Sequence, residues 1–196
     1  MRPTFVSVIT PTWQRHDLLL TRCVPSVAAQ SYAAVEHVVI SDGPDPELDA
    51  WDETAALVTV FDQLPEHPPE PHWGAAVRRR GLELATGGYI AYLDDDDAYR
   101  PHHCATLAAA LDANPDADFA YSLMSSQGDT VGTAPPSYCN IGTPMIMHRR
   151  ETLQFGTWGP DGIAEDWDLV ERWLQAGARY VHVPEITVDV WPSAYR

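Results

Sequence analysis

The chain contains the stretch Gly87-Gly88-Tyr89-Ile90-Ala91-Tyr92-Leu93-Asp94-Asp95-Asp96-Asp97. Its apolar part predicts a buried strand that follows a glycine turn. The four aspartates should therefore emerge at the carboxyl end of this strand, where open α/β sheets bind ligands. Adjacent carboxylates repel one another, and Mg²⁺ or Mn²⁺ would relieve that repulsion. A solvated acidic turn, with Asp97 capping a helix near Pro101, explains the same run equally well.

Strand-like and helix-like segments alternate along the rest of the chain. Strands are expected at residues 5–10, 35–40, 57–61, 89–93, 119–124, 143–148 and 180–183, and helices at 17–30, 47–55, 74–85, 101–113 and 166–176. The alternation predicts one α/β domain over residues 1–196, with a mainly parallel, Rossmann-like central sheet and helices on both of its faces. Loops are expected at residues 64–71, which hold four prolines, and at 125–138.

Composition narrows the class of protein. Among 196 residues there are 12 Lys and Arg against 28 Asp and Glu, a formal net charge of −16, which opposes binding to nucleic acid. Three distant cysteines form neither a disulfide framework nor a CxxC metal motif, and this favours a reducing cytoplasm. No stretch has the length and polarity of a membrane span. A peripheral position at the inner face of a membrane and a homo-oligomer are left open.

Polar or aromatic residues also follow the first two expected strands. They are Pro11-Thr12-Trp13 and Ser41-Asp42-Gly43. Because the carboxyl ends of parallel strands share one edge of a sheet, these residues should converge with the aspartate run on one ligand. Trp13 could stack on a planar base, and Asp42 could accept a hydrogen bond from a base imide or a sugar hydroxyl. A core aromatic and a turn former are the alternatives.

The densest basic run is Arg78-Arg79-Arg80. On a helix its side chains fan over roughly 200°, so one or two of them at most can face a shared site. An arginine facing the acids would suit a diphosphate. For Arg79 and Arg80 an exposed basic face is expected. The chain has neither GxxxxGK[ST] nor GxGxxG, so a metal and an arginine would have to neutralise phosphate.

Glu165-Asp166 stands at the expected start of a helix. Acidic residues stabilise helix starts, so a capping role is one interpretation. A general base is the other, since burial against Trp158 and Trp167 would raise the pKa of a carboxylate toward a useful range.

Taken in order, these motifs resemble those of family 2 glycosyltransferases with the GT-A fold. The resemblance runs from Val6 to Pro184 and rests on residues 6–15, 26–32, 38–43, 77–90, 93–97 and the pair 165–166. Ser41 replaces the first of two usual aspartates, and Arg79 stands where Asn is usual. After His182 the chain has no late histidine of the kind that some members use as a metal contact.

The resemblance implies a role for each motif residue. Asp96 would be the direct metal ligand of a DxD motif, and Asp166 the catalytic base. Nucleotide-sugar contacts would come from Pro11, Trp13, Asp42, Arg78, Asp94 and Asp95, and acceptor contacts from Trp158 and Glu165. Trp158 could equally be a packing residue. Residues 1–100 would form the donor half and residues 101–196 the acceptor half.

The implied activity is a metal-dependent, inverting transfer of a hexosyl group from a nucleoside-diphosphate sugar to an acceptor hydroxyl. UDP is the favoured carrier, with dTDP and GDP as alternatives. The acceptor would be a glycan, a natural product or a lipid-linked sugar. Two other functions fit part of the pattern: a metal-dependent nucleotidyl or phosphoryl transferase, and a non-catalytic nucleotide-sugar-binding subunit. The acceptor-side acids argue against the second, because a pure binder needs no base.

Overall fold

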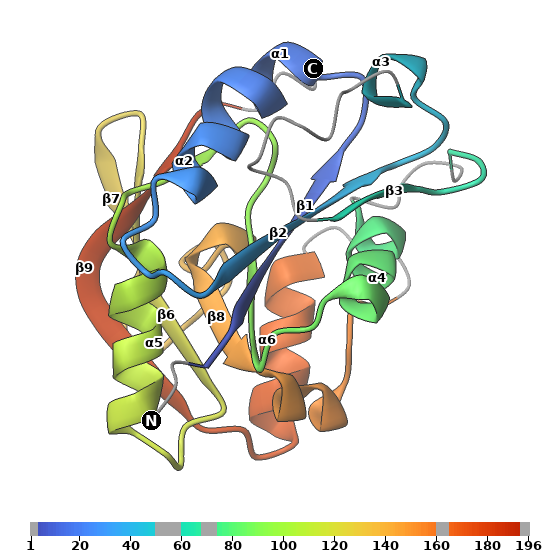
Figure 1. Ribbon diagram of the computed structural model, residues 1–196. Helices are drawn as coiled ribbons and strands as arrows, with labels where there is room; N and C mark the ends of the chain where they lie inside the picture. The colour runs from blue at the N-terminus through green and yellow to red at the C-terminus, as the bar shows by residue number, and fades with distance from the viewer. Residues whose placement is uncertain (1–3, 50–59, 68–73, 160–164, 193–196) are drawn as a thin grey trace.

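The protein is described by a computed structural model that covers residues 4–49, 60–67, 74–159 and 165–192 (Figure 1). Through these residues runs one sheet with the strand order β3-β2-β1-β4-β8-β6-β9-β5, and β7 pairs with β6 outside this path. The strands are β1 (Val6–Thr12), β2 (Val35–Ser41), β3 (Val60–Gln63), β4 (Tyr89–Tyr92), β5 (Ala98–Tyr99), β6 (Phe119–Ser126), β7 (Asp129–Val131), β8 (Ile146–Arg149) and β9 (Tyr180–Val190). The α/β architecture predicted from the sequence is confirmed.

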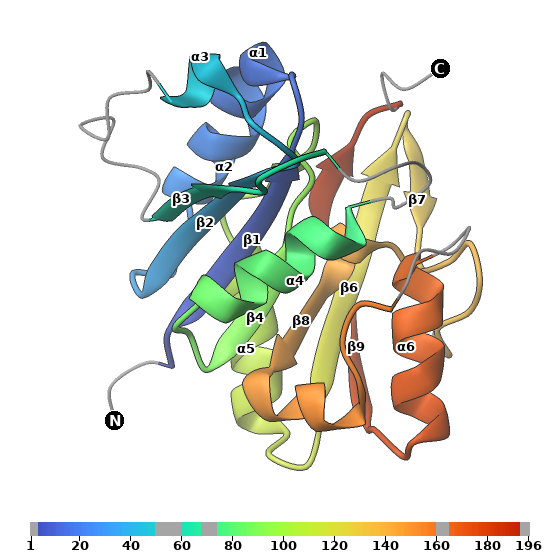
Figure 2. The ribbon, with the colours of Figure 1, turned by 90° about the vertical axis from the view of Figure 1, so that its right-hand side faces the viewer.

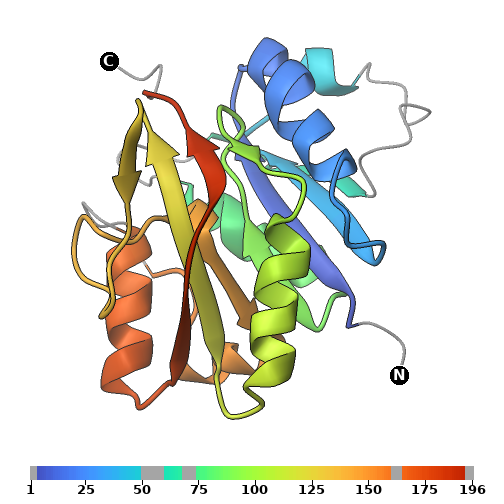
Figure 3. The same cartoon turned by 90° about the vertical axis from the view of Figure 1, so that its left-hand side faces the viewer.

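Helices cover both faces of this sheet. They are α1 (His16–Leu18), α2 (Val24–Ala28), α3 (Pro46–Asp49), α4 (Ala75–Leu84), α5 (His103–Ala113) and α6 (Glu165–Gln175). On one face lie α4 and α6 (Figure 2), and on the other lie α5 and the segment that contains α1 and α2 (Figure 3). Short 3₁₀ turns span Thr143–Met145 and Arg150–Phe155.

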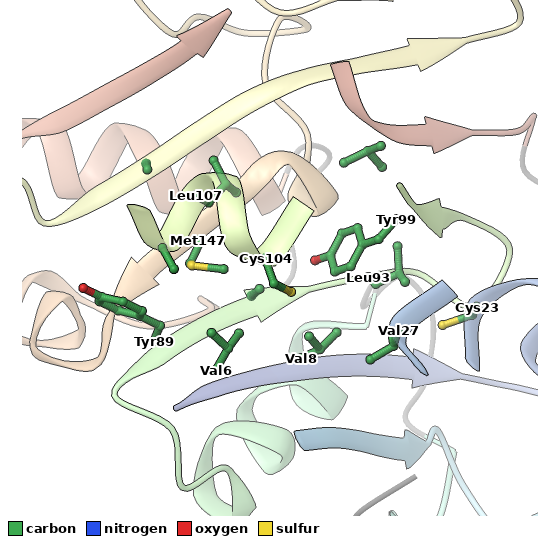
Figure 4. Close-up of a cluster of buried hydrophobic side chains, with 14 of the residues drawn as sticks. Val6, Val8, Cys23, Val27, Tyr89, Leu93, Tyr99, Cys104, Leu107 and Met147 are labelled. Atoms are coloured by element: carbon green, nitrogen blue, oxygen red, sulfur yellow. The ribbon is translucent and has the colours of Figure 1, made fainter. Parts of the chain in front are cut away.

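Strand β4 is buried on both faces, as its apolar sequence predicted. Tyr89, Ala91 and Leu93 belong to the core beneath α5 (Figure 4), whereas Ile90 and Tyr92 belong to the core beneath α4 and α6. Each of these five side chains is at most 2% exposed. The alternation of Cβ directions along a strand divides the run between two hydrophobic cores, so β4 holds the two layers together.

The helical segment after β1 contains Pro25, as expected for a kinked helix. It runs from α1 through a π-helical turn at Leu19–Cys23 into α2, where Pro25 lies in the first turn. Proline lacks the N–H that an uninterrupted α-helix would use, and a wider turn before it accommodates this loss. The predicted helix at 17–30 therefore forms, with its irregularity just before the proline.

The second half of the sheet differs from a purely parallel arrangement. Parallel pairing links β1 with β2 and β4, β2 with β3, and β6 with β9, whereas β8 is antiparallel to both β4 and β6. Part of the loop expected at residues 125–138 is a hairpin, because Gln127 and Gly128 both have positive φ and turn β6 into β7. Strand β9 also runs on to Val190, well past the predicted strand at residues 180–183.

The predictions at residues 47–55, 57–61 and 64–71 fall partly outside the described residues. Where the chain is described, α3 and β3 agree with the first two. In the whole part of the chain that the structure describes, no helix is both long and apolar enough to cross a membrane.

Helix α4 packs so closely on β1 that a glycine is required at the contact. A Cβ added to Gly81 would lie 2.4 Å from Cγ2 of Ile9, whose side chain is fully buried. We expect Gly81→Ala to lower the free energy of unfolding by about 1–3 kcal/mol despite the better helix propensity of alanine. Denaturant unfolding measures this change. In an Ile9→Ala background the cost should shrink, and an equal cost in both backgrounds would contradict the contact.

Candidate active site

The carboxyl ends of β1, β2 and β4 meet at one edge of the sheet, as their parallel pairing requires. Thr12 is the register partner of Ser41, and the backbone N–H of Asp42 donates to the carbonyl oxygen of Thr12 at 2.8 Å. On the other side of β1, the N–H of Leu93 donates to the carbonyl oxygen of Ile9. The three loops singled out in the sequence therefore lie beside one another, and the predicted convergence is confirmed.

The aspartate run is a buried turn and not a solvated one. Asp95, Asp96 and Asp97 are 0%, 7% and 3% exposed, and the N–H of Asp97 donates to the carbonyl oxygen of Asp94. Desolvation raises the pKa of all three buried carboxyls, to about 7 for Asp95 and about 8 for Asp97. Carboxylates this reluctant to ionise call for positive charge nearby.

Arg15 supplies much of that charge. Its Nη2 lies 2.8 Å from Oδ1 of Asp95, and its Nη1 lies 2.6 Å from Oδ2 of Asp96. The hydroxyl of Thr12 donates to the remaining oxygen of Asp95 at 2.7 Å. Sequence reasoning did not single out Arg15. Only its position three residues beyond the end of β1 could have indicated it, because the turn at Gln14, with φ of 51°, is invisible to periodicity.

Asp97 has a different role from the helix cap proposed for it. Helix α5 begins at His103 and has no side-chain cap, whereas Oδ1 of Asp97 accepts a hydrogen bond from the N–H of Trp191 at 3.1 Å. Arg22 donates to the carbonyl oxygen of Asp96, and its guanidinium lies 4.2 Å from the ring centroid of Trp191. The capping prediction was wrong, because the chain after β4 first forms β5 and pairs with β9 before α5 starts.

The three consecutive arginines of α4 point in different directions, as predicted. Arg78 is 3% exposed and holds Oδ1 of Asp94 at 2.6 Å, with its guanidinium 5.0 Å from the ring centroid of Trp158. Arg79 donates to the carbonyl oxygens of Trp158 and Gly159, so it anchors that segment and does not form the expected exposed face. Arg80 pairs with acidic residues at the surface. Only Arg78 joins the aspartate run.

The start of helix α4 lies in space beside the end of β1. Gly74, its N-cap, has φ of 83°, and a Cβ added there would lie 3.6 Å from Cβ of Pro11. This contact places Pro11 beside the first turn of the helix that carries Arg78. The structure places Pro11 at this edge of the sheet. Its contact with a nucleotide sugar remains a prediction.

Trp13 and Asp42 lie together, and His67 lies with them. The rings of Trp13 and His67 stack with centroids 4.6 Å apart and planes 10° from parallel. Nδ1 of His67 is 2.8 Å from the carbonyl oxygen of Asp42 and 3.6 Å from its Oδ2. A Cβ on Gly43, where φ is 126°, would lie 2.9 Å from the Trp13 ring and 2.9 Å from the backbone nitrogen of His67. His67 was missed in the sequence, where it lies in the proline-rich loop.

Asp166 lies in the first turn of α6. Desolvation raises its pKa, and the charges of Arg78 and Asp94 also act on it, lowering and raising the pKa respectively. Oδ1 of Asp166 accepts a hydrogen bond from the N–H of Trp167 at 2.7 Å. The carboxylate therefore lies within the electrostatic influence of Arg78 and Asp94. The side chain of Glu165 lies outside the described residues.

Trp158 is a packing residue. It is 2% exposed, and its ring meets Tyr92 edge to face with centroids 5.0 Å apart. Of the two roles considered for Trp158, stacking on a sugar is therefore not supported in this arrangement. Its ring instead makes a cation–π contact with the guanidinium of Arg78.

The residues present are compatible with a divalent cation. Within the described segments, no group of three or more His, Cys, Asp and Glu side chains could hold a metal by itself. Mg²⁺ and similar ions, however, use one or two carboxylates together with substrate phosphates and water. Asp95 and Asp96 offer the required hard oxygen atoms and follow Asp94, the partner of Arg78, so they could provide the protein's share of such a site.

Comparison with known proteins gives the family. Residues 7–163 match the family profile described as glycosyl transferase family 2. A glucosyl-dolichyl phosphate glucuronosyltransferase of Haloferax volcanii is 32% identical over 57% of this chain and 35% of its own, and a PGL/p-HBAD biosynthesis glycosyltransferase of Mycobacterium bovis is 28% identical over 93% of this chain and 76% of its own.

Two solved structures share the fold at 18% identity. S. aureus TarS 1-349 in complex with UDP-GlcNAc has a TM-score of 0.79 over 98% of this chain and 60% of its own. The mannosyltransferase PcManGT of Pyrobaculum calidifontis, in complex with GDP-Man and Mn²⁺, has a TM-score of 0.78 over 100% of this chain and 59% of its own. This chain thus spans little more than a third of the Haloferax relative and about 60% of these two structures. The chain belongs to glycosyl transferase family 2, and its fold is that of the GT-A enzymes.

Proposed function

We propose that this protein is a metal-dependent, inverting glycosyltransferase that moves a sugar from a nucleoside-diphosphate donor to an acceptor hydroxyl. The observation that carries the proposal is the meeting of a buried aspartate run, a buried arginine and an aromatic ring at one edge of the sheet. Asp166, on a different helix, shares their electrostatic environment. Complexes of fold relatives with UDP-GlcNAc and with GDP-Man and Mn²⁺ support a nucleotide-sugar donor and a divalent cation.

Each group has a physical task in the proposed reaction. Trp13 and Asp42 would hold the base, by stacking and by a hydrogen bond respectively. Arg78 would compensate the charge that develops on the departing diphosphate. Asp96 would hold a Mg²⁺ or Mn²⁺ ion, as the resemblance implied, and we add Asp95 as its partner because Arg15 pairs with both carboxylates. When bound, the ion supplies Lewis-acid stabilisation of the leaving group.

Asp166 would remove the proton of the acceptor hydroxyl as its oxygen attacks the anomeric carbon. Attack from the face opposite the leaving group inverts the configuration at that carbon. Because desolvation raises the pKa of Asp166, the carboxylate is a stronger base than an exposed aspartate.

The donor half would be residues 1–100 and the acceptor half residues 101–196. UDP is the favoured carrier, with dTDP and GDP as alternatives, and a glycan, a natural product or a lipid-linked sugar would accept the sugar. Cys23 and Cys104 are buried free thiols and Cys139 is an exposed one, which supports a reducing, cytoplasmic setting.

A panel of nucleotide sugars with Mn²⁺ or Mg²⁺ tests the reaction type. Slow hydrolysis to free sugar and nucleoside diphosphate is expected, with the anomeric configuration of the first product inverted by NMR. Release of pyrophosphate would instead indicate a nucleotidyl transferase, and binding without turnover would indicate a non-catalytic subunit. EDTA should abolish turnover.

The base assignment is tested with Asp166→Asn. We expect turnover to fall by about 10²–10⁴-fold, because the amide cannot accept the hydroxyl proton, while UDP and Mn²⁺ affinities stay unchanged. In the wild type, turnover should fall as the pH drops below the raised pKa of this group. Asp168→Asn is the matched control, since that carboxylate lies in the same helical turn but is exposed and pairs with Arg172. Normal turnover in Asp166→Asn would refute the assignment.

The metal assignment is tested with Asp96→Asn, which keeps the shape of the side chain but removes its charge. UDP affinity in the presence of Mn²⁺ should drop by about tenfold or more, whereas UDP affinity in EDTA should match the wild type. Calorimetry measures both. The EDTA titration is the control for damage to the nucleotide site, and equal Mn²⁺-dependent affinity in variant and wild type would contradict the role of Asp96.

His67 stacks on Trp13 and makes a hydrogen bond with the carbonyl oxygen of Asp42. Stacking and hydrogen bonding are also the two contacts expected of a nucleotide base at these residues. Nucleotide binding should therefore have to displace its ring, and His67→Ala should bind UDP several-fold more tightly. His102→Ala is the control, because His102 is part-exposed and pairs with Glu185 away from the site. Weaker UDP binding by His67→Ala would mean that the imidazole contributes to base binding.

A further inference from the structure

Arg15 pairs with two aspartates at once, as a bound cation would. Its two terminal nitrogens contact two different carboxylates, Asp95 at 2.8 Å and Asp96 at 2.6 Å, and so bridge them as a metal ion could. The side chain of Asp95 is 0% exposed, and its second oxygen is taken by Thr12. In this arrangement a metal ion cannot reach both carboxylates unless Arg15 moves.

The side chain of Arg15 could be displaced without moving a strand. It lies outside β1, at the start of the helical segment, where its carbonyl oxygen accepts the N–H of Leu19 and fixes the backbone. Its side chain is 18% exposed, in contrast to the 4% of Arg78. A change of side-chain torsions alone could take the guanidinium off the carboxylates without disturbing β1.

The balance of charge favours an Arg15 that exchanges the aspartates for phosphate over an Arg15 that neutralises them permanently. Asp94 to Asp97 bring four carboxyl groups together. Among the described residues, Arg15 and Arg78 pair with carboxylates of this run, and Arg22 donates to the carbonyl oxygen of Asp96. A diphosphate brought to this turn adds negative charge that the same groups must balance. The planar fork of a guanidinium group can bind two oxygens of a phosphate as well as it binds those of a carboxylate.

We propose that Arg15 competes with the divalent cation for Asp95 and Asp96, and that a nucleoside-diphosphate donor releases it by offering phosphate oxygens in exchange. The inference rests on the proposed function, because it concerns how the donor and metal enter the same site. It makes metal binding and donor binding cooperative: the free protein holds Mn²⁺ weakly, and each ligand strengthens the other by the same factor. Arg15 thereby becomes a donor-binding residue.

Direct Mn²⁺ titration, followed by the EPR signal of free Mn²⁺ with and without UDP, tests this. Without UDP, Arg15→Gln should bind Mn²⁺ about tenfold or more tightly than the wild type, because the carboxylates lose their competing cation. The factor by which UDP enhances Mn²⁺ affinity should shrink in the variant. Arg80→Gln is the matched control: it removes the same charge from an ion pair with Asp62 and Glu83 and should behave as the wild type.

Arg15→Lys is a second variant for the case in which Arg15→Gln does not fold. A single ammonium retains the charge but cannot bridge both carboxylates in the fork geometry, so an intermediate gain in Mn²⁺ affinity is expected. Circular dichroism and thermal unfolding check that each variant is folded. If Arg15→Gln does not fold, the affinity of Arg15→Lys decides.

The failures of the two proposals are distinguishable. Mn²⁺ affinity in the folded variants that equals or falls below the wild-type value, while wild-type protein still binds Mn²⁺ with UDP, overturns the competition and leaves the transferase intact. UDP binding without any Mn²⁺ binding, in wild type and variants alike, removes the metal from the proposed function. In that case Arg15 replaces the metal permanently, and the exchange is overturned too.

Discussion

The burial of several adjacent carboxylates at the end of β4 is the constraint on which the rest of the site depends. Charges this close cannot be taken out of water without counter-charges, and the chain brings arginines from separate elements to meet them. Arg15 comes from the loop after β1, Arg22 from the π-helical turn and Arg78 from α4. The positions of these elements against the sheet are therefore tied to the electrostatics of one short turn.

The same constraint explains why the site is filled by the protein's own side chains. Arg15 bridges two carboxylates as a cation would, and His67 stacks on Trp13 as a base would. The Arg15 contact gives partners to carboxylates that would otherwise be buried unpaired, which is costly. A ligand must therefore exchange contacts, and its binding free energy is the difference between two sets of favourable interactions.

Much of the fold could be read from local pattern. Strand β4 is a continuous apolar run, β1 and β2 are rich in β-branched apolar residues, and α6 ends at Gln175, one residue before its predicted end. The second half was harder, because β8 pairs antiparallel to its neighbours and a Gln127-Gly128 turn forms a hairpin inside an expected loop. Such pairing depends on partners distant in sequence, which periodicity does not contain.

By itself the sequence determined the α/β alternation, the buried strand before the acids, the convergence of three strand ends and the choice of Arg78 among three arginines. The first three follow from hydrophobic period and from the shared edge of parallel strands, whereas the choice of Arg78 came from the family resemblance. Only the tertiary structure decided that Arg15 and His67 lie in the site, that Asp97 binds Trp191 in place of a helix, and that Trp158 is buried. Those contacts join residues tens of positions apart, and their geometry depends on turns and packing that no local pattern encodes.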